Sequence, residues 1–259
     1  MSIANEILRL QTAKADIKTA IENKGVMVGD GTIDTYAEKI NEISGGEGDY
    51  EQGYNDGYEK GSMPLYYSDS FSLQNAEFPE NTELCLRYKN KRDYYSAFYN
   101  TTNLKSIKLI CETSSPTYDG TNIFRNSPQL EIVDLTELQS NPKNIRWGFL
   151  GDKKLKSILG AFDFSGCTAC TEWLNSCDVL EDISFVPNTI KISINFIYSS
   201  KLTNASKQSI FDGLATVETA QTLTLHANVK ILQSQVDSAN AKGWTVAGGT
   251  VVSEEEYYG

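Results

Sequence analysis

The stretch FRNSPQLEIVDL, residues 124–135, decides the fold. A phenylalanine is followed six positions later by a leucine, and this leucine begins a short run of alternating apolar positions. Four copies share this arrangement, at residues 98–109, 124–135, 149–160 and 174–185, with aliphatic Leu174 in place of the phenylalanine in the fourth, and a degenerate fifth copy spans 196–202. The repeated leucines are Leu104, Leu130, Leu155, Leu180 and Leu202, which are 26, 25, 25 and 22 residues apart. Such a period is typical of a repeat that contributes one short strand and one return segment.

The run LxxIxL directs its first, fourth and sixth side chains inward and leaves the others facing solvent. A single copy cannot cover its own apolar stripe, so copies must stack and pair their strands with one another. Gly160 occupies the sixth position of the third copy and leaves that copy one core side chain short. We therefore predict an α/β repeat fold, a leucine-rich-repeat solenoid with an N-terminal helical hairpin and a C-terminal α/β cap. The alternative is an irregular all-β domain.

The return segments between the leucines resemble those of the BspA-like bacterial surface repeats. FYNTTNLKSIKL (98–109), FRNSPQLEIVDL (124–135) and FDFSGCTACTEWLNSCDVLEDISF (162–185) each run from an aromatic residue through small residues or cysteine to a leucine and a strand, without an asparagine ladder. The resemblance covers residues 75–205, and residues 136–148 depart from it. It implies a non-enzymatic binding surface and leaves the ligand open.

Composition excludes several classes of partner. Lysine and arginine number 23 and aspartate and glutamate 34, so the formal charge is 23 − 34 = −11. An acidic chain without a basic stripe is a poor nucleic-acid or anionic-membrane binder, because phosphate attraction supplies most of such binding. No apolar run is long enough to span a membrane, and no secretion signal is recognisable. We expect neither nucleic acid nor membrane insertion.

The five cysteines favour packing roles. An odd number scattered among repeat positions, namely Cys85, Cys111, Cys167, Cys170 and Cys177, predicts reduced, partly buried thiols rather than a disulfide framework. A zinc site needs four ligands, and Cys167, Cys170 and Cys177 supply three while the only histidine is distant in sequence. We expect no metal and no cofactor.

The N-terminal residues predict helices. A heptad seam at residues 3–21 has Lys14 as its one polar position and predicts a helix that self-associates as a coiled coil or docks on the next helix. Its apolar members are Ile3, Ile7, Leu10, Ile17 and Ile21. Thr35 and Glu38 form a capping box that begins a second helix. Both interpretations of the seam remain open.

Residues 10–43 resemble a short helical module of bacteriophage and prophage tail and baseplate proteins. The shared positions are Lys14, Ile17, Ala20, Ile21, Lys24, Gly25, Val26, Tyr36, Ala37, Lys39 and Ile40. The resemblance implies attachment or oligomerisation in a virion tail. We divide the chain into this module (1–45), a Tyr/Gly-rich linker (46–62), the repeats with an N-terminal cap (63–203) and a C-terminal cap (204–259).

Aromatic residues near the first repeat admit two roles. Tyrosines are concentrated there, at Tyr66, Tyr67, Tyr94, Tyr95 and Tyr99. Such rings can anchor an interface or complete the cap, since they join apolar area to a polar tip. In the C-terminal cap we expect a helix at 202–217, strands at 222–225 and 244–248, a helix at 229–242, and a solvated tail at 253–259.

Catalytic motifs are missing from the sequence. His226 has no nucleophile motif beside it, and neither a zinc-protease motif nor a phosphate-binding glycine loop occurs. The leading hypothesis is therefore a non-enzymatic, tail-associated adhesion protein in a virion, which presents its outward strand residues to a protein or glycan. Those candidate residues are Lys105, Ser106, Lys108, Glu131, Asp134, Lys156, Ser157, Glu181, Asp182 and Ser184. Alternatives are a bacterial cell-surface protein that binds host or matrix proteins and, less favoured, a polysaccharide-degrading enzyme.

Overall fold

The computed structural model describes residues 72–88, 93–111, 117–138 and 140–258, the backbone of Leu65–Tyr67, and five positions near the N-terminus. The chain divides into two compact units, Met1–Glu59 and Lys60–Gly259. The five N-terminal positions are helical, and of the three seam residues among them Ile21 is buried, Lys14 is half-buried and Ile17 is exposed. The rest of the expected helical hairpin, with Ile3, Ile7 and Leu10, and the linker at 46–62 lie outside the described residues.

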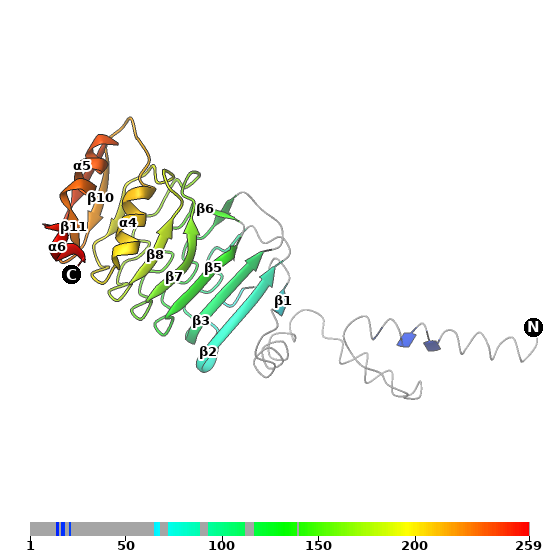
Figure 1. Ribbon diagram of the computed structural model, residues 1–259. Helices are drawn as coiled ribbons and strands as arrows, with labels where there is room; N and C mark the ends of the chain where they lie inside the picture. The colour runs from blue at the N-terminus through cyan, green and yellow to red at the C-terminus, as the bar shows by residue number, and fades with distance from the viewer. Residues whose placement is uncertain are drawn as a thin grey trace, which may run out of the picture. The chain divides into compact units, whose positions relative to one another are not determined.

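Six parallel strands form the main sheet of the second unit and follow one another across it in chain order (Figure 1). They are β1 (Leu65–Tyr67), β2 (Glu77–Tyr88), β3 (Thr102–Cys111), β5 (Ile132–Leu138), β7 (Ser157–Phe162) and β8 (Asp182–Phe185). Ser106, Ile132, Ser157 and Asp182 share one register row. These four are 26, 25 and 25 residues apart, so the period of the leucines is also the period of the strands.

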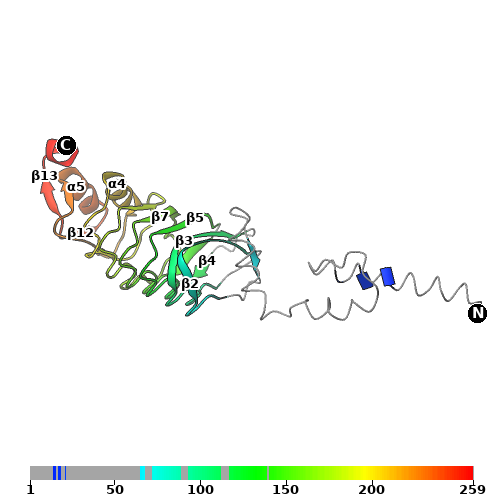
Figure 2. The same ribbon diagram turned by 90° about the horizontal axis from the view of Figure 1, so that it is seen from below.

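Smaller parallel sheets accompany the main one. One pairs β4 (Thr117–Asp119) with β6 (Asn141–Asn144). Another has the order β12 (Trp244–Ala247), β10 (Gln221–Leu225), β9 (Ile194–Phe196), and the last pairs β11 (Lys230–Leu232) with β13 (Thr250–Val252). Between and after these strands come the helices α4 (Asn204–Gly213), α5 (Gln233–Ala241) and α6 (Glu254–Tyr258). Figure 2 shows α4, α5, β12 and β13 at the end of the stack away from β2.

The prediction of an α/β leucine-rich-repeat solenoid is wrong. The second unit consists mostly of parallel-strand sheets with few helices, and its described strands do not close into a solenoid. The physical reason lies in the return segments, which are turns containing left-handed residues such as Asn122 and Asn126, with φ of 56° and 60°. An α-helix cannot include residues in that region of backbone space. In the described part of this unit, helices follow only after residue 203.

The inward positions of LxxIxL were nonetheless predicted well. The four leucines that begin the copies are fully buried, and so are the fourth residues of the runs, with at most 2% exposure. These buried residues are Leu104, Leu130, Leu155 and Leu180, followed by Ile107, Val133, Ile158 and Ile183. The sixth position varies, because Leu109 and Phe185 are buried whereas Leu135 is half-buried.

Gly160, the sixth residue of the third run, has a backbone reason to be glycine. Its φ is +96°, and a Cβ placed there would lie 2.9 Å from the carbonyl carbon of Leu135. The pairing of β7 with β8 shifts register between Ser157 and Ala161, and Phe162 is buried two residues later. The copy therefore regains an apolar core side chain through an irregular strand.

An aromatic column lies inside the turns. Phe98 stacks on Phe124 with ring centroids 5.0 Å apart, and Phe124 stacks on Phe149 at 5.4 Å. Trp173 continues the column edge-on at 6.4 Å from Phe149. The sequence pattern placed Leu174 in this series. Leu174 is buried, but the ring that continues the column belongs to the preceding residue, Trp173.

A buried polar column accompanies the rings, three residues before each repeated leucine. It consists of Thr101, Ser127, Asp152 and Cys177, all with at most 1% exposure. The hydroxyls of Thr101 and Ser127 are 2.7 Å apart, and the Ser127 amide donates to Asp152 Oδ1 at 2.8 Å. Asp152 Oδ2 accepts no hydrogen bond from the described residues. Desolvation raises the pKa of Asp152 well above its ordinary value, against a smaller lowering by the Ser127 amide.

Helix α4 ends the main sheet. Ser206 Oγ accepts from the Ile183 amide at 3.0 Å, and Ser209 Oγ accepts from the Phe185 amide at 2.8 Å. The hydroxyls thus replace the next strand along the edge of β8, which would otherwise present unpaired amides.

The C-terminal elements lie within a few residues of their predicted positions. Their large apolar side chains include five with at most 2% exposure, namely Ile210, Leu214, Leu223, Leu225 and Trp244. The tail is exposed at residues 253–256 and 258, as predicted for a solvated segment. It nonetheless forms α6, whose Tyr257 is buried and holds the Lys207 ammonium 4.1 Å from its ring centre.

Candidate functional site

The ten candidate residues lie on β3, β5, β7 and β8 or on the residue just before each strand. Backbone hydrogen bonds connect one candidate residue of each copy into a row, because its amide donates to the carbonyl of the corresponding residue in the previous copy. The bonds run from Glu131 to Lys105, from Lys156 to Glu131 and from Glu181 to Lys156. The structure therefore places Lys105, Glu131, Lys156 and Glu181 in line across neighbouring copies. All four are half-buried or exposed.

Two further rows run parallel to this one on the strands themselves. Ser106, Ser157 and Asp182 share a row with Ile132. Lys108 and Asp134 share the next row with Leu159. Ser184 pairs with Ala161 beyond the irregular part of β7. We call the three rows and Ser184 the outer face; sequence reasoning missed its apolar members, Ile132 and Leu159, which are 39% and 41% exposed.

Most charged side chains on the outer face are paired across the strands. Lys105 lies 3.6 Å from Glu83, and Lys156 lies 3.2 Å from Glu131. Lys108 lies 2.6 Å from Glu137 and 3.7 Å from Asp134. The hydrogen bond to Glu137 raises the pKa of Lys108.

A hydroxyl continues the pairing on the later strands, since Ser157 Oγ donates to Asp182 Oδ2 at 2.9 Å. The charges alternate in sign along the row of Lys105, Glu131, Lys156 and Glu181, and the ion pairs join residues of different copies of the repeat.

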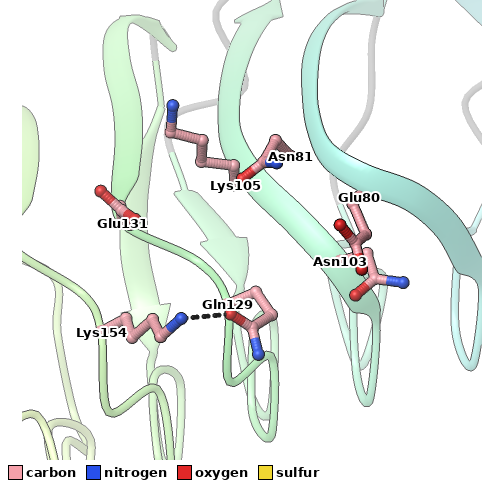
Figure 3. A pocket seen from close by; sticks show the side chains of 7 residues that line it. All are labelled: Glu80, Asn81, Asn103, Lys105, Gln129, Glu131 and Lys154. Carbon is pink, nitrogen blue, oxygen red and sulfur yellow. Dashed lines mark hydrogen bonds between the residues drawn. The ribbon is translucent and has the colours of Figure 1, made fainter.

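A polar hollow opens at the beginning of these strands (Figure 3). Its volume is about 240 Å³, and it is lined by two carboxylates, two ammonium groups and three carboxamides. The lining residues are Glu80, Asn81, Asn103, Lys105, Gln129, Glu131 and Lys154. Such a set offers hydrogen-bond donors and acceptors with balanced charge, which suits a polar ligand.

The hollow is held by the irregular first part of β2 and β3 and by the turns before β5 and β7. Asn81 and Asn103 both have φ of +63°, and Asn103 Nδ2 donates to the Phe78 carbonyl at 2.9 Å. Lys154 Nζ donates to Gln129 Oε1 at 2.5 Å, as Figure 3 shows. Short asparagine side chains tolerate left-handed backbone, so these positions fit their residues.

Sequence reasoning identified two of the seven residues around the hollow, Lys105 and Glu131. A signal for three others was present, because Asn103, Gln129 and Lys154 each come directly before a repeated leucine. Reading the period at that position would have found them. Glu80 and Asn81 carry no such signal.

The tyrosine group near the first repeat contains both buried and exposed members. Tyr94 is fully buried and meets Tyr88 and Tyr118 edge-on at 5.8 and 5.4 Å, whereas Tyr95 is 59% exposed. Nothing is described of the side chains of Tyr66 and Tyr67.

The five cysteines form no disulfide bond; four of them are buried and Cys85 is half-buried. Burial raises the pKa of Cys167 to about 11 and that of Cys170 to about 12. Within the described ranges, no group of histidine, cysteine and carboxylate side chains is placed to hold a metal ion. Nor does any helix in the described part have the length and apolar character needed to cross a membrane.

Comparisons of the chain with models of known families, with curated proteins and with solved structures found no match. Function is therefore inferred from the chemistry of the surfaces described above.

Proposed function

We propose that this chain is a non-enzymatic binding protein that uses the outer face to hold a protein or glycan on a bacterial or host surface. The observation that carries the proposal is the set of aligned rows, in which charged side chains from successive copies lie side by side on one sheet. The strands beneath are fixed by buried leucines and rings, so the side chains are presented in a constant arrangement.

Energetics support recognition at this face. Exposed ion pairs contribute about 0–1 kcal/mol each, so a ligand with complementary charges can exchange them at little cost. Charges of both signs also select a partner by its pattern rather than by its net charge. The exposed Ile132 and Leu159 add apolar contact between the charged rows.

The setting we propose is a phage or prophage tail. Support comes from the resemblance of residues 10–43 to the helical module of tail-associated proteins, which would attach or oligomerise the chain. In this setting the outer face would bind the cell surface that the virion meets.

Charge exchange within one ion pair tests the proposal. The double variant Glu131→Lys with Lys156→Glu keeps a pair at the same place but inverts its direction, so stability should be nearly unchanged. We expect binding of fluorescently labelled full-length protein to bacterial cells, measured by flow cytometry, to fall at least about tenfold in apparent affinity.

The matched control exchanges a pair of the same kind elsewhere, Lys230→Glu with Glu256→Lys, where the charges lie 3.4 Å apart between β11 and α6. This control should bind like the parent chain. Equal binding by all three proteins would contradict the assignment of the outer face. Turnover of a polysaccharide by the parent chain would contradict the non-enzymatic part.

A further inference from the structure

A second hollow, of about 640 Å³, lies where three parallel strands end. The strands β9, β10 and β12 form one sheet and finish at Phe196, Leu225 and Ala247. The residues that follow directly, Ile197, Tyr198, His226, Ala227 and Gly248, all line the hollow. In parallel sheets the carboxyl ends of strands are the usual place for a ligand, because the chain leaves each strand there and the loops diverge.

The backbone around this hollow is fixed without any ligand. Gly248 has φ of +75°, and a Cβ there would lie 2.1 Å from the Leu225 carbonyl oxygen, so the exit from β12 admits only glycine. The Ile197 amide donates to Asn195 Oδ1 at 2.8 Å and holds the exit from β9. A site with a fixed backbone loses little conformational entropy on binding.

The lining of the hollow combines apolar surface with an aromatic ring. Ile197 and Tyr198 are 44% and 43% exposed, although both follow a strand whose ends are buried. Exposed apolar side chains grouped in a concave place mark binding sites more often than scattered ones do. A tyrosine ring adds a flat face for C–H groups and a hydroxyl for hydrogen bonds.

The lining also includes polar groups. His226 Nδ1 accepts from the Asn228 amide at 3.0 Å, so the neutral imidazole carries its proton on Nε2 and offers a donor there. The Asp178 side chain is exposed and contributes an anionic acceptor, and Ser200 and Thr224 contribute hydroxyls.

We infer that this hollow binds a neutral saccharide through one sugar ring. A pyranose has a C–H face that fits the Tyr198 ring and hydroxyls that both donate and accept, as Asp178 and His226 require. A phosphate or other anion would face the Asp178 carboxylate, and a purely apolar ligand would leave the polar groups without partners. The site shares no residue with the outer face, so either can fail without the other.

Titration of the full-length chain with methyl glycosides of glucose, galactose, mannose and N-acetylglucosamine tests the inference. At least one glycoside should bind with a dissociation constant on the order of millimolar, measured by ligand-observed NMR. Tyr198→Ala should weaken that binding at least about tenfold, and Tyr198→Phe should retain most of it.

The donor role of His226 has its own readout. His226→Ala should weaken binding, whereas His226→Gln, whose amide can place a donor in a similar position, should restore part of it. The matched control is Tyr95→Ala, because Tyr95 is exposed but lies before β3 and far along the chain from the hollow.

Two results would overturn the inference. One is the absence of binding to all four glycosides by the parent chain, as expected if a peptide fills the hollow. The other is binding that Tyr198→Ala and His226→Ala both leave unchanged. The exchange of Glu131 with Lys156 should leave glycoside binding intact, which separates this site from the proposed outer face.

Discussion

The inner and outer sides of the stacked copies are built by different rules. On the inner side, the rings stack on their counterparts in the next copy, and both rings and leucines have almost no exposed surface. On the outer side, charged residues meet their counterparts as half-exposed ion pairs. Burial of apolar area contributes several times more free energy per residue than an exposed pair does. The inner side therefore fixes the fold, and the outer side is free to vary for recognition.

The largest expected effect comes from opening the aromatic column. Phe124→Ala removes a fully buried ring that stacks on both of its neighbours, and it should lower the free energy of unfolding by about 3–5 kcal/mol. Urea unfolding followed by tryptophan fluorescence measures the change. Leu159→Ala on the outer side is the comparison, and it should cost less than about 1 kcal/mol. Similar losses for the two variants would erase the distinction between the sides.

A smaller loss of stability is expected from a substitution in the irregular strand β7. Gly160→Ala combines left-handed backbone with a contact of 2.9 Å to the Leu135 backbone, and it should destabilise the chain by about 2 kcal/mol. Gly166→Ala is the matched control, because its nearest neighbour is Thr117 Cγ2 at 3.4 Å. Thermal unfolding should separate the two variants, and equal melting temperatures would refute the backbone explanation.

The smallest change concerns the one carboxyl group of the polar column. Because burial raises the pKa of Asp152 in the folded state, its proton is held more tightly there than in the unfolded chain. Stability should therefore be greatest below the ordinary aspartate pKa of about 4 and should fall as pH rises toward the folded pKa.

Asp152→Asn removes this titration and should raise the free energy of unfolding by about 1–2 kcal/mol at pH 7. Urea unfolding at pH 4 and pH 7 measures both parts, and the gain should shrink at the lower pH. A gain that is equal at the two values, or a loss at pH 7, would show that the carboxylate is compensated in the folded chain.

The period of the leucines was enough to predict which leucines face the core and how many residues separate one strand of the main sheet from the next. It could not predict the path of the return segments, because their apolar spacing is also compatible with a helix. The left-handed backbone of Asn122 and Asn126 excludes that helix. The ring of Trp173 likewise replaced Leu174 in the column, a choice that depends on the turn rather than on the spacing.

The candidate sites were predictable to different degrees. The charged rows follow from strand alternation, and the residue before each leucine, as at Gln129, could have been read from the same period. The saccharide hollow could not be predicted from the sequence, since Ile197, His226 and Gly248 come from strand ends far apart in sequence. Those strands are only three to five residues long and leave no distinct pattern.

The different burial of the cysteines allows local opening of this molecule to be followed by alkylation. Cys111, Cys167, Cys170 and Cys177 are buried, so alkylating reagents reach them only when the surrounding structure opens. Cys85 is half-buried and shares a strand row with Lys108, so it marks the outer face and reacts at a rate set by its own exposure. Counting modified cysteines over time by intact mass would thus follow the opening of single copies, while a dye on Cys85 would sense an arriving ligand.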